Sequence, residues 1–360
     1  MHRRLEFRRT FIALTVSALA WVAPASPVHA QPTYYQVVSI LVDPQQATLK
    51  QDWIASQFLS AEQQAVVSAI EFFQLGELDD ALEVLANYQA TSSLPELFFW
   101  AGRIYGRQAA EASVFSAKGL AENALENFLR AVELDASFIE GHQALIQYYL
   151  QAPFFAGGSI EKADAQALKL LALDTLKGQF AQLEIAQREE RETQIPRLQT
   201  AIANTLAQKY AAFDFDGVDN GYYQLALLAM QQEQWDQGRE WLNNGLDANR
   251  DAQAQLENSG VIQRVEAYRS KVTEQSILYQ LGRIGVLSEA NIDDSIMAFQ
   301  RFLTGPEHPI YNRYWAQLRL AQLKLLIGDK ASAQTLYDGL PEVDDDNYEK
   351  AKKQLRKKLK

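Results

Sequence analysis

The feature that most constrains the fold of this chain is a spacing pattern that occurs six times. Each occurrence has a small or medium residue at position i, generally a larger apolar residue at i+4, and another small or apolar residue at i+7. These positions share one helix face, where a small residue lets a second helix approach closely. A closely packed array of helix pairs is therefore expected. The six occurrences are Ala81, Leu85, Tyr88; Ala124, Phe128, Ala131; Ala163, Ala167, Leu170; Gly238, Leu242, Gly245; Ser295, Phe299, Phe302; and Ala333, Tyr337, Leu340.

A first helix is expected in front of each of these second helices. From Gln51 onward the apolar residues keep a period of about 3.6, and almost no stretch alternates as a strand requires. The chain is therefore predicted to be all-α, with helix, tight turn, helix as its unit. The first-helix and turn residues are Ala69, Phe72, Gly76; Gly102, Tyr105; Leu145, Tyr149; Leu225, Ala226, Ala229; Leu281, Gly282; and Leu320, Ala321, Gly328.

This unit resembles the tetratricopeptide repeat (TPR), a helical hairpin of about 34 residues. The resemblance implies a right-handed superhelical solenoid of about six to seven TPR-like hairpins. The residues that match the family in the first copy are Ala69, Phe72, Gly76, Leu78, Ala81, Leu85 and Tyr88, and those in the last are Leu320, Ala321, Gly328, Lys330, Ala333, Tyr337 and Leu340.

The copies between these two depart from the family pattern. Insertions are expected at 106–120 and 152–158, a degenerate copy at 178–211, and an extra helix near 252–272. The stretch 148–163, YYLQAPFFAGGSIEKA, resembles a subset of exported bacterial TPR proteins that share an AP…GGS…KA insertion. That resemblance implies an exported repeat protein and says nothing of an activity.

The N-terminus has the composition of an export signal. Four arginines within residues 3–9 precede a short apolar stretch at 11–23, and small residues lead to Ala30. We predict a signal peptide over 1–30, cleaved after Ala30, and a periplasmic mature protein. A retained membrane anchor and a twin-arginine signal are the alternatives; with cleavage, no stable membrane insertion is expected.

The remaining chain is expected to have three parts. Residues 31–50 are predicted to be a linker, residues 51–345 the superhelix, and residues 346–360 a basic capping helix. A terminal repeat needs a cover that is polar on its outer side. The alternative for the last segment is contact with anionic lipid or an acidic partner.

Composition excludes several classes of function. The chain has no cysteine, so it has no disulfide framework and no thiolate chemistry. Without residues 1–30 it has 34 − 4 = 30 basic and 45 − 1 = 44 acidic residues, a net charge of −14. Because this excess repels phosphate backbones, nucleic-acid binding is not expected. The oligomeric state stays open.

No catalytic or metal-binding pattern is visible in the sequence. Only His142 and His308 remain after the signal, which makes neither a zinc site nor a catalytic triad. We expect His142 to be structural and His308 to be exposed. Residues 157–159 suggest a turn and helix cap, with a phosphate cradle as the alternative. Residues 214–220 suggest a turn, with a calcium loop as the alternative.

The sequence therefore predicts a non-enzymatic binding protein without metal or cofactor. The family resemblance implies that first helices line a concave face, where a protein or peptide partner would bind. The lysine/asparagine set by which some cytosolic relatives hold a peptide carboxylate is not present. A small-ligand-binding or transporter-accessory protein is the alternative, and an envelope hydrolase with an unrecognised site is a third. The family's inward-facing positions correspond to Phe99, Arg103, Gln143, Gln147, Tyr223, Tyr279 and Arg283.

Overall fold

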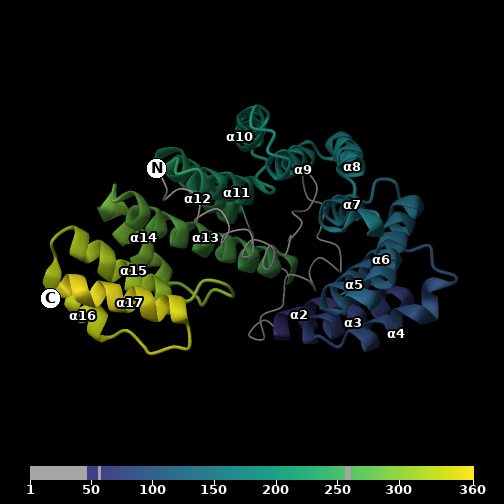
Figure 1. Ribbon diagram of the computed structural model, residues 1–360, viewed down its shortest axis with the longest axis horizontal. Helices are drawn as coiled ribbons and strands as arrows, with labels where there is room; N and C mark the ends of the chain where they lie inside the picture. Colours follow the sequence, from purple (N-terminus) through teal and green to yellow (C-terminus); the bar gives the residue numbers. More distant parts are fainter. Residues whose placement is uncertain (1–46, 56–57, 256–260) are drawn as a thin grey trace. The chain divides into compact units, whose positions relative to one another are not determined.

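The structure is a computed structural model that describes residues 47–55, 58–255 and 261–360 (Figure 1). The predicted export signal and residues 31–46 of the predicted linker lie outside the described residues. The chain divides into two compact units at Asp214 and Phe215. We call the described residues up to Asp214 the N-terminal unit and the residues from Phe215 the C-terminal unit.

The N-terminal unit contains α-helices and one short 3-10 helix. Helix α2 includes residues 47–50 of the predicted linker. The elements are α2 (Ala47–Ala55), α3 (Ala61–Leu75), α4 (Leu78–Gln89), α5 (Pro95–Glu111), α6 (Val114–Leu134), α7 (Ile139–Gln151), η2 (Phe154–Ala156), α8 (Ile160–Leu173), α9 (Thr175–Arg188) and α10 (Ile195–Ala211).

The C-terminal unit is also helical, and no strand occurs in the described part of the chain. Its elements are α11 (Val218–Gln231), α12 (Trp235–Gln255), α13 (Val261–Ser288), α14 (Ile292–Thr304), α15 (Arg313–Leu326), α16 (Lys330–Asp338) and α17 (Asp346–Leu359). None of the described helices is long and apolar enough to span a bilayer.

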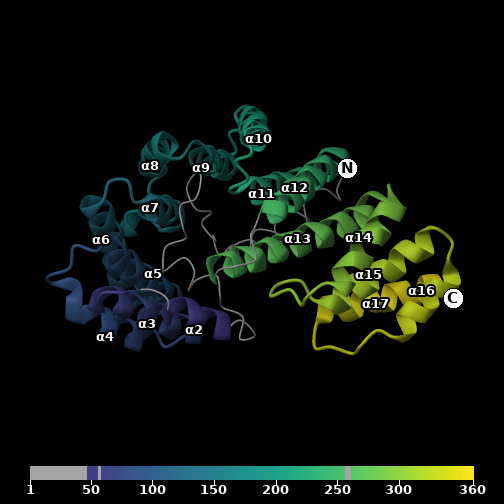
Figure 2. The same cartoon turned by 180° about the vertical axis from the view of Figure 1, so that it is seen from behind.

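Successive helices pair into hairpins within each unit. The pairs are α3/α4, α5/α6, α7/α8 and α9/α10, then α11/α12, α13/α14 and α15/α16. First helices of neighbouring hairpins also pack together, as α3, α5, α7 and α9 do in the N-terminal unit and α11, α13 and α15 do in the C-terminal unit (Figure 2). The predicted all-α solenoid of six to seven TPR-like hairpins is confirmed in the described residues.

The spacing pattern predicted the helix pairs correctly because its small residues lie where two helices touch. Ala81, Ala124 and Ala163 are fully buried. A Cβ atom at Gly102 would lie 2.6 Å from the ring of Phe128, so only glycine allows α5 and α6 to approach this closely.

The irregular copies are partly as predicted. Residues 106–120 lengthen α5 and α6, and the degenerate copy at 178–211 forms the pair α9/α10. The prediction of an extra helix near 252–272 is wrong. Instead, α12 continues to Gln255 and α13 begins at Val261 and runs for 28 residues. The additional length is absorbed by lengthening α12 and α13, which belong to two neighbouring hairpins.

The 152–158 insertion is a turn followed by a capped helix. Gly157 has a φ of 92°, and the side chain of Ser159 accepts a hydrogen bond from the Lys162 amide at 3.3 Å. The turn-and-cap interpretation of this stretch is confirmed. The insertion also leaves Phe154 92% and Phe155 66% exposed.

Residues 214–217 lead into α11, which begins at residue 218, and carboxylates of the 214–220 stretch have protein partners. Asp214 pairs with Lys209 at 2.5 Å, and Asp219 accepts a hydrogen bond from Asn249 at 2.7 Å. Gly217 has a φ of 70° and precedes α11. The described residues contain no group of three or more His, Asp or Glu side chains placed to share a metal ion.

Helix α17 covers the last hairpin. Tyr348, Leu355 and Leu359 are buried in one cluster with residues of α15 and α16. Asp345 accepts hydrogen bonds from the Asn347 and Tyr348 amides, both at 3.0 Å, which fixes the start of the helix. The basic side chains of α17 are mostly exposed.

Candidate functional site

Three of the predicted site residues lie together in the C-terminal unit. Tyr223 comes from α11, and Tyr279 and Arg283 come from α13. Tyr311, in the loop between α14 and α15, joins them, and Arg319 of α15 completes the group. We call these five residues the tyrosine–arginine cluster.

The tyrosines of this cluster are held by direct contacts. The hydroxyl groups of Tyr223 and Tyr311 are 2.5 Å apart. The Tyr311 ring stacks on Tyr279, with centroids 4.3 Å apart and planes 8° from parallel. Gln280 donates a hydrogen bond from Nε2 to the Tyr311 hydroxyl at 2.9 Å. The loop between α14 and α15 is therefore attached to both α11 and α13.

The two arginines of the cluster lack carboxylate partners among the described residues, and Arg319 lies against aromatic rings. The Arg319 guanidinium carbon lies 5.4 Å from the ring centre of Tyr279 and 5.2 Å from that of Trp315. Its Nη1 atom is buried without a hydrogen-bond partner. Arg283 donates from Nη1 to Gln280 Oε1 at 3.3 Å. Neither arginine has a salt bridge within the described residues.

Burial raises the pKa values of two tyrosines of the cluster, Tyr223 and Tyr279. Desolvation raises the pKa of Tyr223 well above its usual value, and the neighbouring Tyr311 raises it further. Desolvation also raises the pKa of Tyr279, although Arg319 and Arg283 oppose this shift. Both phenols are therefore neutral hydrogen-bond donors at physiological pH.

His308 fixes the position of Tyr311. Its Nδ1 accepts hydrogen bonds from the Ile310 amide at 3.0 Å and the Tyr311 amide at 2.9 Å. The proton must therefore be on Nε2, which lies 2.9 Å from the Ser276 hydroxyl. His308 is only 9% exposed, so its expected exposure is wrong: the proline-flanked loop folds inward and stacks the imidazole on Tyr311.

In the N-terminal unit, Arg103 has a comparable aromatic setting. Its guanidinium carbon lies 4.3 Å from the ring centre of Trp100, 5.3 Å from Phe73 and 5.7 Å from Phe99. The side chain is partly exposed, and no described carboxylate pairs with it. Burial lowers the pKa of Arg103 to about 10, so it remains charged at neutral pH.

The other predicted residues of the N-terminal unit have different surroundings. Phe99 is buried and contacts Phe128 and Phe138 across helices, so it belongs to the core. Gln147 donates to Glu184 at 2.7 Å and connects α7 to α9. Gln143 has a buried Nε2 atom without a hydrogen-bond partner. His142 is buried and bonded to Gln166, which confirms its structural role.

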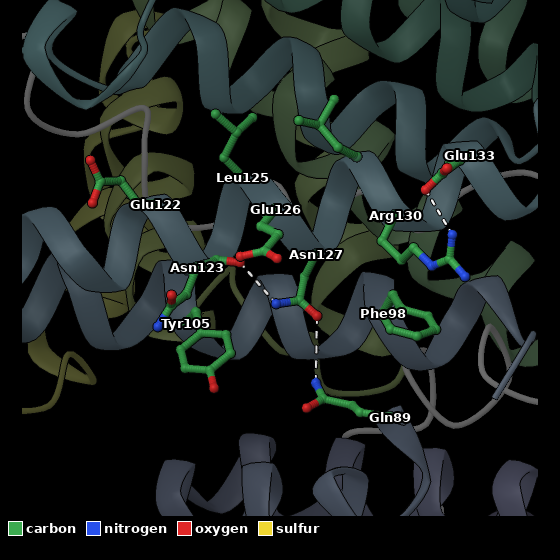
Figure 3. A pocket seen from close by; sticks show the side chains of 11 residues that line it. Gln89, Phe98, Tyr105, Glu122, Asn123, Leu125, Glu126, Asn127, Arg130 and Glu133 are labelled. Atoms are coloured by element: carbon green, nitrogen blue, oxygen red, sulfur yellow. Dashed lines mark hydrogen bonds and ion pairs between the residues drawn. The ribbon is translucent and has the colours of Figure 1, made fainter. Parts of the chain in front are cut away.

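A separate cavity of about 700 Å³ lies where α4, α5 and α6 meet (Figure 3). None of the predicted site residues lines it. Three glutamates border it, and Glu133 is paired with Arg130 at 2.7 Å. Its apolar border includes Phe98 and Leu129. This surface is acidic, in contrast to the tyrosine–arginine cluster.

Sequence reasoning did not find Tyr311, His308 or Arg319. Tyr311 and His308 lie in a loop, outside the family's helical positions. Arg319 follows Trp315 by four residues on α15, which places both on the same helix face. That spacing, together with the similar Trp100–Arg103 spacing on α5, is the signal that points to Arg319.

No family model and no curated protein matches the chain. Among solved structures it is similar to one described as a functional characterisation of Pseudomonas aeruginosa PilF, with 15% identity, a TM-score of 0.38, and 66% of this chain and 89% of that chain covered. It is also similar to Acl4, described as an assembly chaperone of RpL4, with 13% identity, a TM-score of 0.38, and 84% and 97% covered. At this level of similarity, the partners of those proteins do not carry over.

Proposed function

We propose that this protein is a non-enzymatic scaffold that binds a protein or peptide through its first helices. One observation carries the proposal: Arg103 on α5 and Arg319 on α15 both lie against aromatic rings without a described carboxylate partner. Arginine and aromatic side chains are enriched among the residues that dominate binding energy at protein interfaces.

The aromatic setting suits an arginine for this role. Contact with the rings restrains the long side chain before binding, which reduces the conformational entropy lost when a partner docks. The guanidinium still has N–H donors that lack acceptors within the described residues. A partner that supplies those acceptors therefore gains charge-assisted hydrogen bonds.

The periplasm is the proposed location. Support comes from the composition of residues 1–30 and from the resemblance of 148–163 to exported TPR proteins. N-terminal sequencing of the protein recovered from cells tests this directly. Export with cleavage gives Gln31 as the first residue, whereas an intact Met1 contradicts it.

The scaffold proposal is tested by crosslinking and affinity capture from envelope extract. We expect the double variant Arg103→Gln/Arg319→Gln to lose a partner that the unmodified protein captures. The matched control is Arg130→Gln/Arg301→Gln, since these exposed arginines already pair with Glu133 and Glu274. The proposal fails if the first variant retains every partner, or if the control loses the same ones.

Small-ligand binding is the second candidate, because the cavity between α4, α5 and α6 is about 700 Å³, within the range of ligand sites. Its glutamates favour an organic cation. Titration with spermidine tests this candidate: a saturable rise in Tm that Glu126→Gln removes supports it, and no rise excludes this class of ligand.

A further inference from the structure

We propose that the tyrosine–arginine cluster is a binding site for one oxyanion, the carboxylate or phosphate group of a ligand. The proposal rests on the scaffold function in one respect: we expect the oxyanion to be a group on the bound partner. The cluster has an excess of hydrogen-bond donors over acceptors, and its donors come from three neighbouring first helices and one loop.

The arginines supply most of this excess. A guanidinium has five N–H donors and no acceptor. Arg319 makes no hydrogen bond with a described group, and its Nη1 is shielded from solvent. Arg283 donates one bond of 3.3 Å to Gln280. Most donors of both side chains therefore lack a protein acceptor.

The tyrosine pair supplies one further donor. Tyr223 and Tyr311 together have two hydroxyl protons, and the hydrogen bond between their oxygens uses one of them. Gln280 is a donor to Tyr311 and cannot accept the other proton through the same amide nitrogen. Whichever tyrosine donates, one phenolic proton lacks an acceptor among the described residues.

The charges around Arg319 favour an anion. Burial lowers the pKa of Arg319, and the positive charge of Arg283 lowers it further. The nearby phenols of Tyr279 and Tyr311 oppose this shift, but no carboxylate among the described residues does. An anion between the two guanidiniums would relieve their repulsion, and its attraction is stronger beside aromatic rings than in bulk water.

Other arginines of the same unit show that carboxylate partners are available. Arg301 pairs with Glu274 at 2.9 Å, and Arg250 pairs with Asp247 at 2.8 Å. The donor excess is therefore a local property of the cluster. Protein contacts also fix its geometry, because His308 and the stacked Tyr279 hold Tyr311 in place. Such preorganisation lowers the cost of binding.

The experiment titrates the purified protein with inorganic phosphate and, separately, with acetate, against sodium chloride at equal ionic strength. The readout is the side-chain Nε–H NMR signals of Arg283 and Arg319. We expect a saturable shift of both signals with at least one oxyanion and not with chloride. Stronger binding of acetate assigns a carboxylate ligand, and stronger binding of phosphate assigns a phosphate group.

The matched variants are Arg319→Gln and Arg301→Gln. We expect the first to weaken oxyanion binding about tenfold, since it removes charged hydrogen bonds, and the second to leave it unchanged. Absence of a shift in the unmodified protein, an equal response to chloride, or equal loss in both variants overturns the proposal. If Arg319→Gln does not fold, the proposal is tested by the response of the Arg283 and Arg319 signals of the unmodified protein to phosphate and acetate. Oxyanion binding without any captured protein partner would refute only the scaffold function.

Discussion

The hydroxyl groups of Tyr223 and Tyr311 lie 2.5 Å apart, although 88 positions separate them in the chain. The bond joins α11 to the loop between α14 and α15, across the intervening hairpin. Contacts of this kind connect elements that nearest-neighbour packing of hairpins does not. The tyrosine pair is therefore expected to contribute to the stability of the C-terminal unit as a whole.

Removing either hydroxyl tests this contribution. Tyr223→Phe is expected to lower the free energy of unfolding by about 1 kcal/mol, since it removes one hydrogen bond. Tyr311→Phe is expected to cost about 2 kcal/mol, because it also leaves the amide of the buried Gln280 without its acceptor. Urea unfolding of both single variants and of the double variant measures the coupling free energy between the two hydroxyl groups. A larger loss for Tyr223→Phe would contradict this assignment.

His308 is expected to make stability depend on pH. Burial lowers its pKa from 6.5 to about 4, so the folded protein binds fewer protons than the unfolded chain between these values. Stability contributed by the neutral imidazole is therefore present at pH 7 and is lost as the pH falls toward 4, by roughly 3 kcal/mol in all.

The matched variant is His308→Asn, whose Oδ1 can accept the two amide bonds now made to Nδ1. We expect a shallower decline of stability from pH 7 to pH 4 in this variant, measured by urea unfolding at each pH. Parallel curves for the variant and the unmodified protein would show that His308 does not titrate in this range.

Two glycines of α5 are expected to respond in opposite directions to alanine. A Cβ at Gly102 would meet the Phe128 ring at 2.6 Å, so Gly102→Ala should destabilise by about 1–3 kcal/mol. A Cβ at Gly106 has nothing within 4 Å. Gly106→Ala should therefore stabilise the helix by about 0.5–1 kcal/mol. Thermal unfolding separates the two, and equal effects would contradict the packing of α5 on α6.

The arginines of the C-terminal unit should differ in their importance for folding. Arg239 donates to the Ala290 carbonyl and the Ser295 hydroxyl, both at 3.2 Å, so Arg239→Met is expected to cost about 1–3 kcal/mol. Arg319→Met should change stability by less than about 1 kcal/mol, because loss of the cation–π contacts is offset by removal of an unpaired, partly desolvated charge. Denaturant unfolding measures the free energy of unfolding of both variants. A similar cost for both would show that Arg319 is structural.

The sequence predicted the hairpins well because their determinants are local. Small residues such as Ala124 and Ser295 mark helix contacts, and both are fully buried in the structure. The extra helix near 252–272 could not be distinguished from longer helices α12 and α13, since either arrangement places helix over most of these residues. Helix periodicity identifies a face but does not identify where a long helix ends.

The candidate site was only partly predictable. The family's inward-facing positions led to Tyr223, Tyr279 and Arg283, which the structure brings together. Tyr311 and His308 approach them through a loop, whose conformation depends on hydrogen bonds to Ser276 and Tyr223 that no local pattern encodes. Phe99 fits an inward position equally well, yet large neighbouring rings enclose it in the core.

Helix α17 determines which surface the last hairpin presents to other molecules. Its apolar side fills the last groove, and its outer side carries closely spaced lysines that repel an identical surface. The apolar residues of the final hairpin that α17 covers are therefore not available for docking another molecule of the same protein. Removing this cover would expose those buried apolar side chains to solvent, and a larger exposed apolar patch favours association with other apolar surfaces.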